Sequence, residues 1–321
     1  MALHFASFIT VLDASLVDSY PLHTFIMTIP PSGPIAQKLI RRLTIFNNRK
    51  VVELRSFATG RQHSEILQKS VASRKTLDGL HPAHAIYVYL QNQVSVLSET
   101  ISALPPLAEL AKNYEEAERT YMPSGPPMSP LTYSYFFFWG VFDAAVGPAR
   151  ETLGTSIIAV IRWAGAHPEF VRLIEVMQQS RMGLYVHDGV EKSIVYLREF
   201  ITDERLPCIV PAGYLGQRGE IWLVRVLPPP APAFTQSVVM TTPYIIQMPR
   251  RDEWQSYLDR TLPKLKVADR FEAYARLMKY GLTFNHWNEY LVDAYVGSQA
   301  SAIFLRGIPD ISSSLPHSPH P

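Results

Sequence analysis

The side chains best able to do chemistry are concentrated in one short run, "NHWNEYLVDAY", residues 285–295. Within it, His286 could serve as a general base or a metal ligand, while Glu289 and Asp293 could orient the imidazole or bind a cation. On a helix that turns about 100° per residue, these three side chains share one narrow stripe. The spacing predicts either a functional site or the water-facing side of an amphipathic helix that Asn285 caps.

Helix geometry limits what this stripe can bind. His286 and Asp293 would lie about 10 Å apart along the helix axis, too far for both to bind one metal ion. His286 and Glu289 could supply two ligands, but a third group such as His187 or Asp188 would have to come from elsewhere in the chain. His286, Glu289 and Asp293 are therefore the candidate catalytic residues. The enzymatic alternative is a metal-dependent hydrolase that uses His286 and Glu289.

Other sequence motifs favour a protein without catalysis. Cys208 is the only cysteine, so no intrachain disulfide can form, and its apolar neighbours in "LPCIVP" indicate a buried thiol rather than a nucleophile. The glycine-rich "GYLGQRG", residues 213–219, precedes a predicted strand, so it is typical of a hairpin turn and not of a phosphate-binding loop. The sequence contains no nucleophile elbow, Walker-type loop, zinc-finger spacing or kinase signature. We expect no bound metal and no cofactor.

Positive charge is concentrated in one segment of the chain. The formal net charge is only +2, yet residues 36–75 contain ten Lys and Arg and only two Glu. Cations this close together reinforce one another's attraction for phosphates or carboxylates. We expect the segment to contact a polyanion, either nucleic acid or an acidic protein. The candidate polyanion-binding residues are Lys38, Arg41, Arg42, Arg49, Lys50 and Arg55.

The basic segment also has a purely structural alternative. Lys and Arg side chains on an amphipathic helix can lie along Leu39, Ile40 and Leu43 and keep their charges in water without binding a partner. Phe46 and Phe57 are the only aromatic residues of the segment. Base stacking, and with it the readout of single strands, therefore has little support within this segment.

Composition indicates a globular protein without a membrane span. The 321 residues are 47% hydrophobic and 18% charged, and the length is typical of about two domains. The most apolar window, residues 131–147, contains Asp143 and is shorter than the roughly 20 residues that span a bilayer. The single cysteine fits a reducing compartment, and the first residues lack the basic start of a secretory signal. We expect a cytoplasmic protein with no membrane contact.

Proline-rich stretches divide the chain. "TIPPSGP" ends an N-terminal arm, and "MPSGPPMSP", residues 122–130, cannot continue a helix or a strand. Helical spacing of apolar residues predicts helices at 83–102, 152–164 and 168–180. The predicted organisation is an N-terminal arm at 1–34, a basic helical region at 35–121, a helical segment at 131–182, a small antiparallel β unit at 183–248, a C-terminal helical segment at 249–310 and a disordered tail at 311–321.

Between residues 183 and 248 the pattern changes to short segments rich in β-branched and aromatic residues. Five of them, "GLYVHDG", "KSIVYLREF", "LPCIVP", "GEIWLVRVLPP" and "SVVMTTPYIIQ", are separated by Gly, Asp and Pro, which is typical of antiparallel strands. They predict a small barrel or a strongly curved sheet. If the unit is a barrel, its core positions should be found among Ile194, Val195, Leu197, Ile221, Leu223 and Val226. The predicted fold class is α+β, mainly helical with a small antiparallel β-barrel-like unit in the C-terminal half.

Four segments within roughly the last 190 residues resemble a family of uncharacterised bacterial proteins: "FDAAVGPARETLG", "WLVRVLPPP", "VVMTTPYIIQ" and "MKYGLTFNHWNEYLVDAY" with "AIFLRGIPD". The resemblance implies a bacterial source and brings no activity, cofactor or site residue with it. The main functional hypothesis from the sequence is therefore a non-enzymatic binding protein whose basic segment contacts a polyanion.

Overall fold

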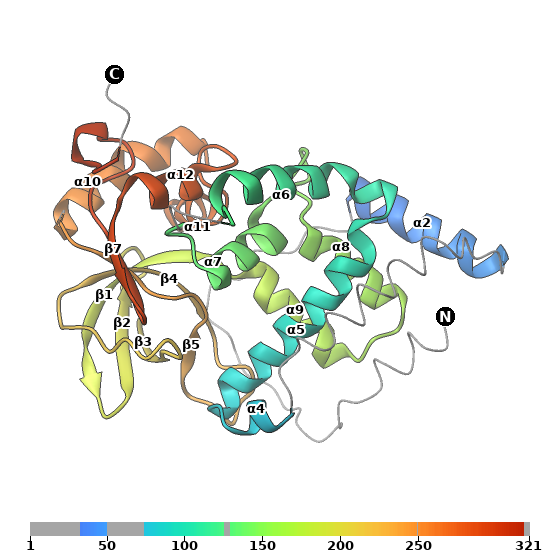
Figure 1. The fold of residues 1–321 in the computed structure, drawn as a ribbon, viewed down its shortest axis with the longest axis horizontal. Helices are drawn as coiled ribbons and strands as arrows, with labels where there is room; N and C mark the ends of the chain where they lie inside the picture. The colour runs from blue at the N-terminus through green and yellow to red at the C-terminus, as the bar shows by residue number, and fades with distance from the viewer. Residues whose placement is uncertain (1–32, 50–73, 125–128, 249, 318–321) are drawn as a thin grey trace. The chain divides into compact units, whose positions relative to one another are not determined.

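The computed structural model describes residues 33–49, 74–124, 129–248 and 250–317 of the chain (Figure 1). These residues form two compact units, each assembled from stretches that are distant in the sequence. The first unit takes its described residues from 1–115, 140–179 and 230–234, and the second takes them from 116–139, 180–229 and 235–321. The predicted N-terminal arm lies almost wholly outside the described residues.

The first unit is helical. Its described elements are α2 (Pro34–Arg49), α4 (Arg74–Asp78), α5 (Pro82–Ser102), the 3-10 turn Pro105–Leu107, the start of α6 (Ala108–Tyr121), α8 (Leu153–Trp163) and α9 (Pro168–Gln179). The three helices predicted at 83–102, 152–164 and 168–180 are confirmed to within one residue at each end. Pro82 and Pro168 begin α5 and α9, where the missing amide hydrogen costs no helical hydrogen bond.

A buried carboxylate holds the start of α2. The Glu151 side chain accepts hydrogen bonds from the Ile35 amide at 3.0 Å and the Ala36 amide at 2.9 Å. These first-turn amides have no partner within the helix, and the carboxylate charge also complements the positive end of the helix dipole. A Cβ atom added to Gly33 would lie 2.4 Å from the carboxyl carbon of Glu151, so any larger residue there would displace this carboxylate. The position of α2 within its unit therefore depends on a residue far along the chain.

The second unit contains eight described strands and several helices. The strands are β1 (Met182–Glu191), β2 (Ile194–Glu199), β3 (Arg205–Ile209), β4 (Ile221–Leu227), β5 (Ser237–Val239), β6 (Tyr244–Ile246), β7 (Tyr295–Gln299) and β8 (Ala302–Leu305). The helices are α7 (Tyr133–Phe138), α10 (Arg251–Thr261), α11 (Arg270–Tyr280) and α12 (His286–Asp293), with 3-10 turns at Leu262–Leu265 and Ser312–Ser314. The observed class is α+β, as the sequence predicts.

Five of the strands close into a barrel. The order is β1-β2-β3-β5-β4, and β4 returns to pair with β1. β1 is long enough for two partners: Met182–Val186 pairs with β4, and Tyr185–Glu191 pairs with β2. β3 and β5 run parallel while the other barrel pairs are antiparallel. The predicted barrel is confirmed, but it is mixed rather than purely antiparallel.

Alternation along the strands decides which side chains fill the barrel. Val195 and Leu197 of β2 belong to the core cluster, as predicted, and the half-buried Val226 packs against it. On β4, however, Trp222 and Val224 belong to this cluster, whereas Ile221 and Leu223 are buried on the opposite face of the strand. Both faces of β4 are covered, so its sequence does not alternate in polarity. The remaining core residues include Tyr185, Cys208, Val239, Ile245 and Ala302.

The sheet extends beyond the barrel into a region predicted to be helical. β8 pairs with β6 in parallel, and β7 pairs with β8 as an antiparallel hairpin, red in Figure 1. The segment predicted as helical, 249–310, thus contains α10, α11 and α12 and in addition the strands β7 and β8. The sequence of β7, "YVGSQ", combines the strand-favouring Tyr and Val with Gly, Ser and Gln, so its strand conformation depends on pairing with β8.

The most apolar window, residues 131–147, is divided between α7 and the π-helical turn Trp139–Asp143. Thr132 caps α7 by accepting a hydrogen bond from the Tyr135 amide, and Phe136 and Phe138 of the helix are buried. The reading of this window as core is confirmed. Within the described ranges, no helix combines the length and the apolar character needed to cross a bilayer.

Replacing Leu223 with Ala is expected to lower the free energy of unfolding by about 2 to 5 kcal/mol, because a buried side chain would leave a cavity. Leu223 is 1% exposed. The matched control is Leu215→Ala, which removes the same atoms from a side chain that is 45% exposed and should cost less than about 1 kcal/mol. Urea unfolding followed by circular dichroism measures both variants. Equal losses would contradict the observed placement of Leu223.

Candidate functional site

The predicted stripe of His286, Glu289 and Asp293 belongs to α12, and the apolar side of this helix is buried, as the sequence predicts. Trp287, Tyr290 and Leu291 are all buried within the second unit. The Trp287 indole nitrogen donates a hydrogen bond to the Leu277 carbonyl at 2.9 Å, which fixes α12 against α11. The expected side-chain cap by Asn285 does not form. α12 is therefore positioned by packing rather than by its first turn.

His286 does not face water freely. Its Nε2 atom lies 3.1 Å from the Tyr257 hydroxyl of α10, and its ring packs edge-on against Trp287. Burial, assisted by the positive charge of Lys264, lowers the pKa of His286 to about 4. Burial likewise raises the pKa of Tyr257 above its usual range. At neutral pH the pair therefore consists of a neutral imidazole and a protonated phenol, which can share a hydrogen bond but cannot supply a strong base.

The two carboxylates of the stripe lie apart from this pair. Glu289 is exposed and Asp293 is half-buried, and burial raises the pKa of Asp293. Burial and the negative charges of Glu289 and Asp293 raise the pKa of Tyr121, so both carboxylates lie near that phenol. Among the residues that the structure describes, no group of three or more His, Cys, Asp or Glu is arranged to hold a metal ion. His286 points toward α10 instead of completing a ligand set with Glu289.

His187 and Asp188, the possible third groups, belong to the barrel. The register of β1 against β2 shifts between His187 and Gly189, so Asp188 is the extra residue of a β-bulge. His187 is buried, its Nδ1 accepts the Gly189 amide at 3.1 Å, and its Nε2 donates to the Leu215 carbonyl at 2.8 Å. Both ring nitrogens are thus used to hold the bulge and the loop before β4.

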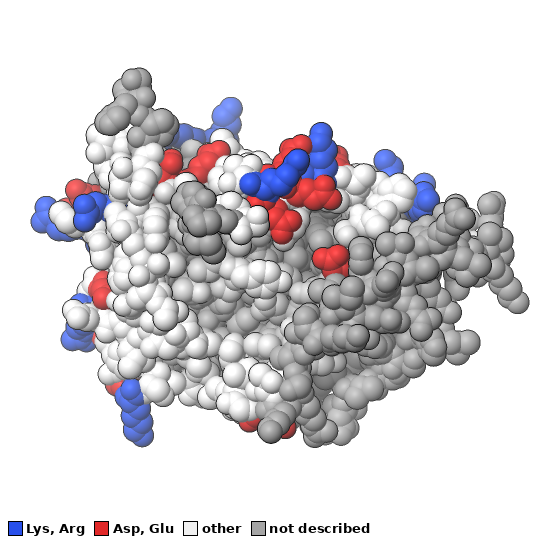
Figure 2. Space-filling view, viewed as in Figure 1, with Lys and Arg blue, Asp and Glu red and all other residues white. Residues whose placement is uncertain are grey.

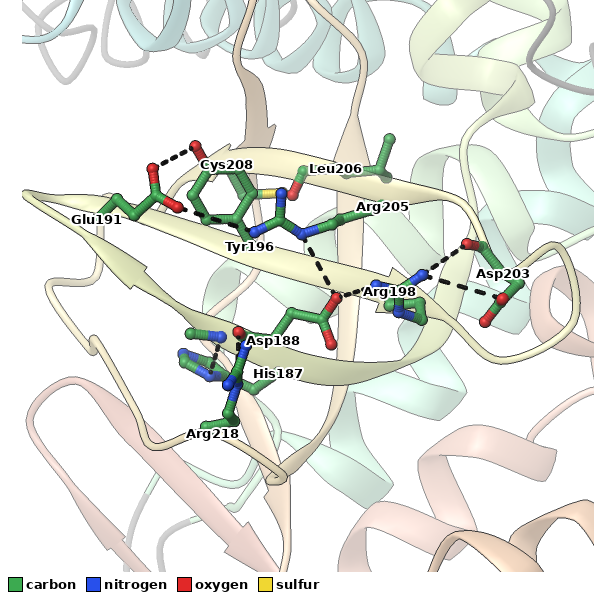
Figure 3. Close-up of polar contacts among 11 residues, drawn as sticks. His187, Asp188, Glu191, Tyr196, Arg198, Asp203, Arg205, Leu206, Cys208 and Arg218 are labelled. Atoms are coloured by element: carbon green, nitrogen blue, oxygen red, sulfur yellow. Dashed lines mark hydrogen bonds and ion pairs between the residues drawn. The ribbon is translucent and has the colours of Figure 1, made fainter.

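A cluster of arginines surrounds Asp188 on the outer face of the barrel (Figure 3). The Asp188 carboxylate lies 2.5 Å from the Arg198 guanidinium and 3.5 Å from Nε of Arg205. The Asp188 backbone carbonyl accepts a hydrogen bond from Nε of Arg218 at 2.9 Å. Asp188, Arg198, Arg205 and Arg218 are called the Asp188 cluster below. Three cations from three separate segments thus meet at one bulge.

One arginine of the Asp188 cluster is stacked on an aromatic ring. The guanidinium carbon of Arg205 lies 3.8 Å from the centre of the Tyr196 ring. The Tyr196 hydroxyl donates a hydrogen bond to Glu191 at 3.1 Å, which raises the pKa of Tyr196. Glu191 also lies 4.0 Å from the Arg205 guanidinium, so one carboxylate lies near both members of the stack.

The Asp188 cluster was not among the sites predicted from sequence. Its members are spread over residues 188–218, a stretch without an excess of positive charge. Pairing of β2 with β3 places Arg198 directly opposite Arg205. The one available signal is the alternation in "IVYLRE", which puts Tyr196 and Arg198 on the same face of a strand.

The predicted polyanion-binding residues lie on α2 and beyond it. Lys38 and Arg41 are exposed and Arg42 is half-buried, while Ala36 and Leu39 face the interior of the first unit. The sequence of α2 contains no acidic residue. Figure 2 shows blue atoms at the upper right, where Figure 1 places α2. Arg49 is the last residue of α2, and Lys50 and Arg55 lie outside the described residues.

The neutral state of His286 makes stability depend on pH. The folded protein holds its pKa near 4, below the ordinary value of 6.5, so the unfolded chain binds a proton more readily between these values. The free energy of unfolding should fall as pH drops through this window, by up to about 3 kcal/mol from His286 alone. His286→Gln should show a flatter pH dependence in urea titrations at about pH 7 and 4.5. An unchanged difference between the two pH values would contradict the burial of the imidazole.

Comparison with known proteins does not identify a relative: no family model, curated protein or solved structure matches the chain. The resemblance to uncharacterised bacterial proteins stays a prediction. Function has to be argued from the charges and contacts of the chain itself.

Proposed function

We propose that this chain is a non-enzymatic binding protein that contacts nucleic acid through the exposed cations of α2. The observation that carries the proposal is the pairing of Lys38 and Arg41 on one solvent-exposed side of a helix without acidic residues. Cations separated by less than a Debye length, about 10 Å at 0.1 M salt, act together on a phosphate backbone. Such contacts give affinity without requiring a particular base sequence.

Anchoring of α2 supports the same function. Glu151 fixes the first turn through the Ile35 and Ala36 amides, and Leu39 is buried against the unit. The cations are therefore presented on a helix that is already ordered, so less conformational entropy is lost on binding.

The architecture of the second unit favours nucleic acid over an acidic protein. A closed five-stranded barrel in which β1 pairs with β2 and β4, and β3 pairs with β5, has the Greek-key layout of the barrels that bind oligonucleotides and oligosaccharides. This support comes from a likeness of architecture and not from a shared site. An acidic protein remains the competing partner, to be separated by experiment.

The hydrolase alternative has less support. His286 is occupied by Tyr257, and Glu289 is exposed and takes part in no metal-ligand group among the described residues. A catalytic His286 would also need a pKa nearer to neutral than about 4 to act as a base at neutral pH. We therefore assign the α12 stripe a structural role.

Charge reversal of Lys38 and Arg41 tests the proposed function. The double variant Lys38→Glu/Arg41→Glu should elute from heparin and from immobilised DNA at lower salt than the parent protein. The slope of log affinity against log salt concentration should fall by about two, one unit for each phosphate contact that is lost. Fluorescence anisotropy with labelled DNA at several salt concentrations gives this slope.

The control variant is Lys264→Glu/Arg306→Glu, which makes the same change in net charge at exposed positions of the second unit. It should elute close to the parent. Equal losses in the two double variants would mean that net charge, and not α2, determines binding. Competition by polyglutamate as strong as that by DNA of equal charge would point to an acidic protein as partner.

A further inference from the structure

The Asp188 cluster places two like charges side by side, which lowers the stability of the fold. Arg198 and Arg205 lie directly opposite each other on β2 and β3, and like charges at such positions repel. The carboxylate of Asp188 relieves this repulsion by contacting both guanidinium groups. Two neutral side chains at these positions would pair without repulsion and would need no carboxylate from the bulge.

The carboxylates do not neutralise the cluster evenly. Asp188 is only 18% exposed and is fixed by its contacts with three arginines. Glu191, by contrast, is 70% exposed and reaches Arg205 only at 4.0 Å. Asp203 is exposed to a similar extent and lies 3.9 Å from Arg198. The Asp188 carboxylate contacts the Arg198 and Arg205 guanidinium groups, whereas Arg218 reaches only the Asp188 backbone carbonyl. Within the cluster, the charge of Arg218 is therefore not paired with the Asp188 carboxylate, and it can attract phosphate.

The Arg205 side chain is oriented for stacking. Tyr196 covers one face of its guanidinium at 3.8 Å, and the side chain as a whole remains 42% exposed. Guanidinium planes and aromatic rings are the two kinds of surface on which unpaired bases stack. Because Asp188 and the Tyr196 ring hold the guanidinium in place, little side-chain entropy is lost when a base arrives.

We infer that the Asp188 cluster, together with Tyr196, binds single-stranded nucleic acid. An unpaired base stacks on the Arg205 guanidinium, which in turn rests on Tyr196, and the neighbouring phosphates contact Arg198 and Arg218. The inference rests on the proposed nucleic-acid function, and it adds a second surface and a preference for single strands. A duplex hides the faces of its bases, so it offers no unpaired base that could stack on the Arg205 guanidinium.

This site differs from the expectation drawn from the basic segment. Within residues 36–75 only Phe46 and Phe57 could stack on bases, so single-strand readout had little support there. On the barrel, the stacking surface is an arginine laid over Tyr196 rather than an aromatic residue within a charge run. The aromatic and the cation come from neighbouring strands, so no local pattern reveals their contact.

The test replaces Arg205 with Lys in the full chain, which keeps the positive charge but removes the planar group. Anisotropy is measured with a fluorescein-labelled mixed-sequence DNA strand and with the duplex of the same sequence. Stacking of one base commonly contributes between about 5-fold and 150-fold in affinity. Arg205→Lys should therefore weaken single-strand binding by about tenfold, while duplex binding should stay within about twofold of the parent.

The matched control is Arg260→Lys, the same chemical change at an exposed arginine of α10 that pairs with Asp310. It should bind both probes like the parent, and thermal unfolding should confirm that both variants fold. Single-strand binding by Arg205→Lys that equals the parent would overturn the inference, as would equal losses for the two probes or the two variants. If Lys38→Glu/Arg41→Glu still weakens DNA binding in that case, the proposed function of α2 stands and only the barrel site is refuted.

Discussion

The second unit depends on the double pairing of β1. A strand that joins β4 through its first half and β2 through its second half must coil sharply, and the bulge at Asp188 provides that bend. Gly189 follows with a φ of 123°, a backbone conformation that favours glycine, and His187 uses both ring nitrogens to hold the turn. The bulge also places Asp188 beside the arginines of β2 and β3. The doubly paired strand and the arginine cluster therefore share one segment of β1.

Much of the fold could be predicted because its signals are local. Prolines mark the starts of α5 and α9, and short β-branched segments mark β1 to β4. The parallel contact of β3 with β5 and the hairpin of β7 with β8 were not predicted, because both depend on pairing between distant or weakly strand-forming segments. The strand β4 was recognised, but Leu223 was assigned to the wrong face, since burial on both sides removes the alternation that would reveal it.

The candidate sites divide in the same way. Exposure of Lys38 and Arg41 follows from helical spacing within one segment, so sequence alone could predict it. The contact of Arg205 with Tyr196 depends on the register of two strands, and a count of charges along the sequence does not reveal this register. His286 was expected on a water-facing stripe, yet α10 brings Tyr257 against it. Tertiary packing sets the pKa and the hydrogen-bond partner of His286, and helix periodicity cannot predict either.

The cap on α2 limits which substitutions the chain can accept at the start of this helix. Gly33 and Glu151 fit each other because the carboxylate occupies the space that a Cβ at position 33 would need. A side chain at position 33 would have to displace this carboxylate, which would disturb the two hydrogen bonds that hold the first turn of α2. The placement of the exposed Lys38 and Arg41 therefore depends on a half-buried glycine and a buried glutamate, neither of which carries positive charge.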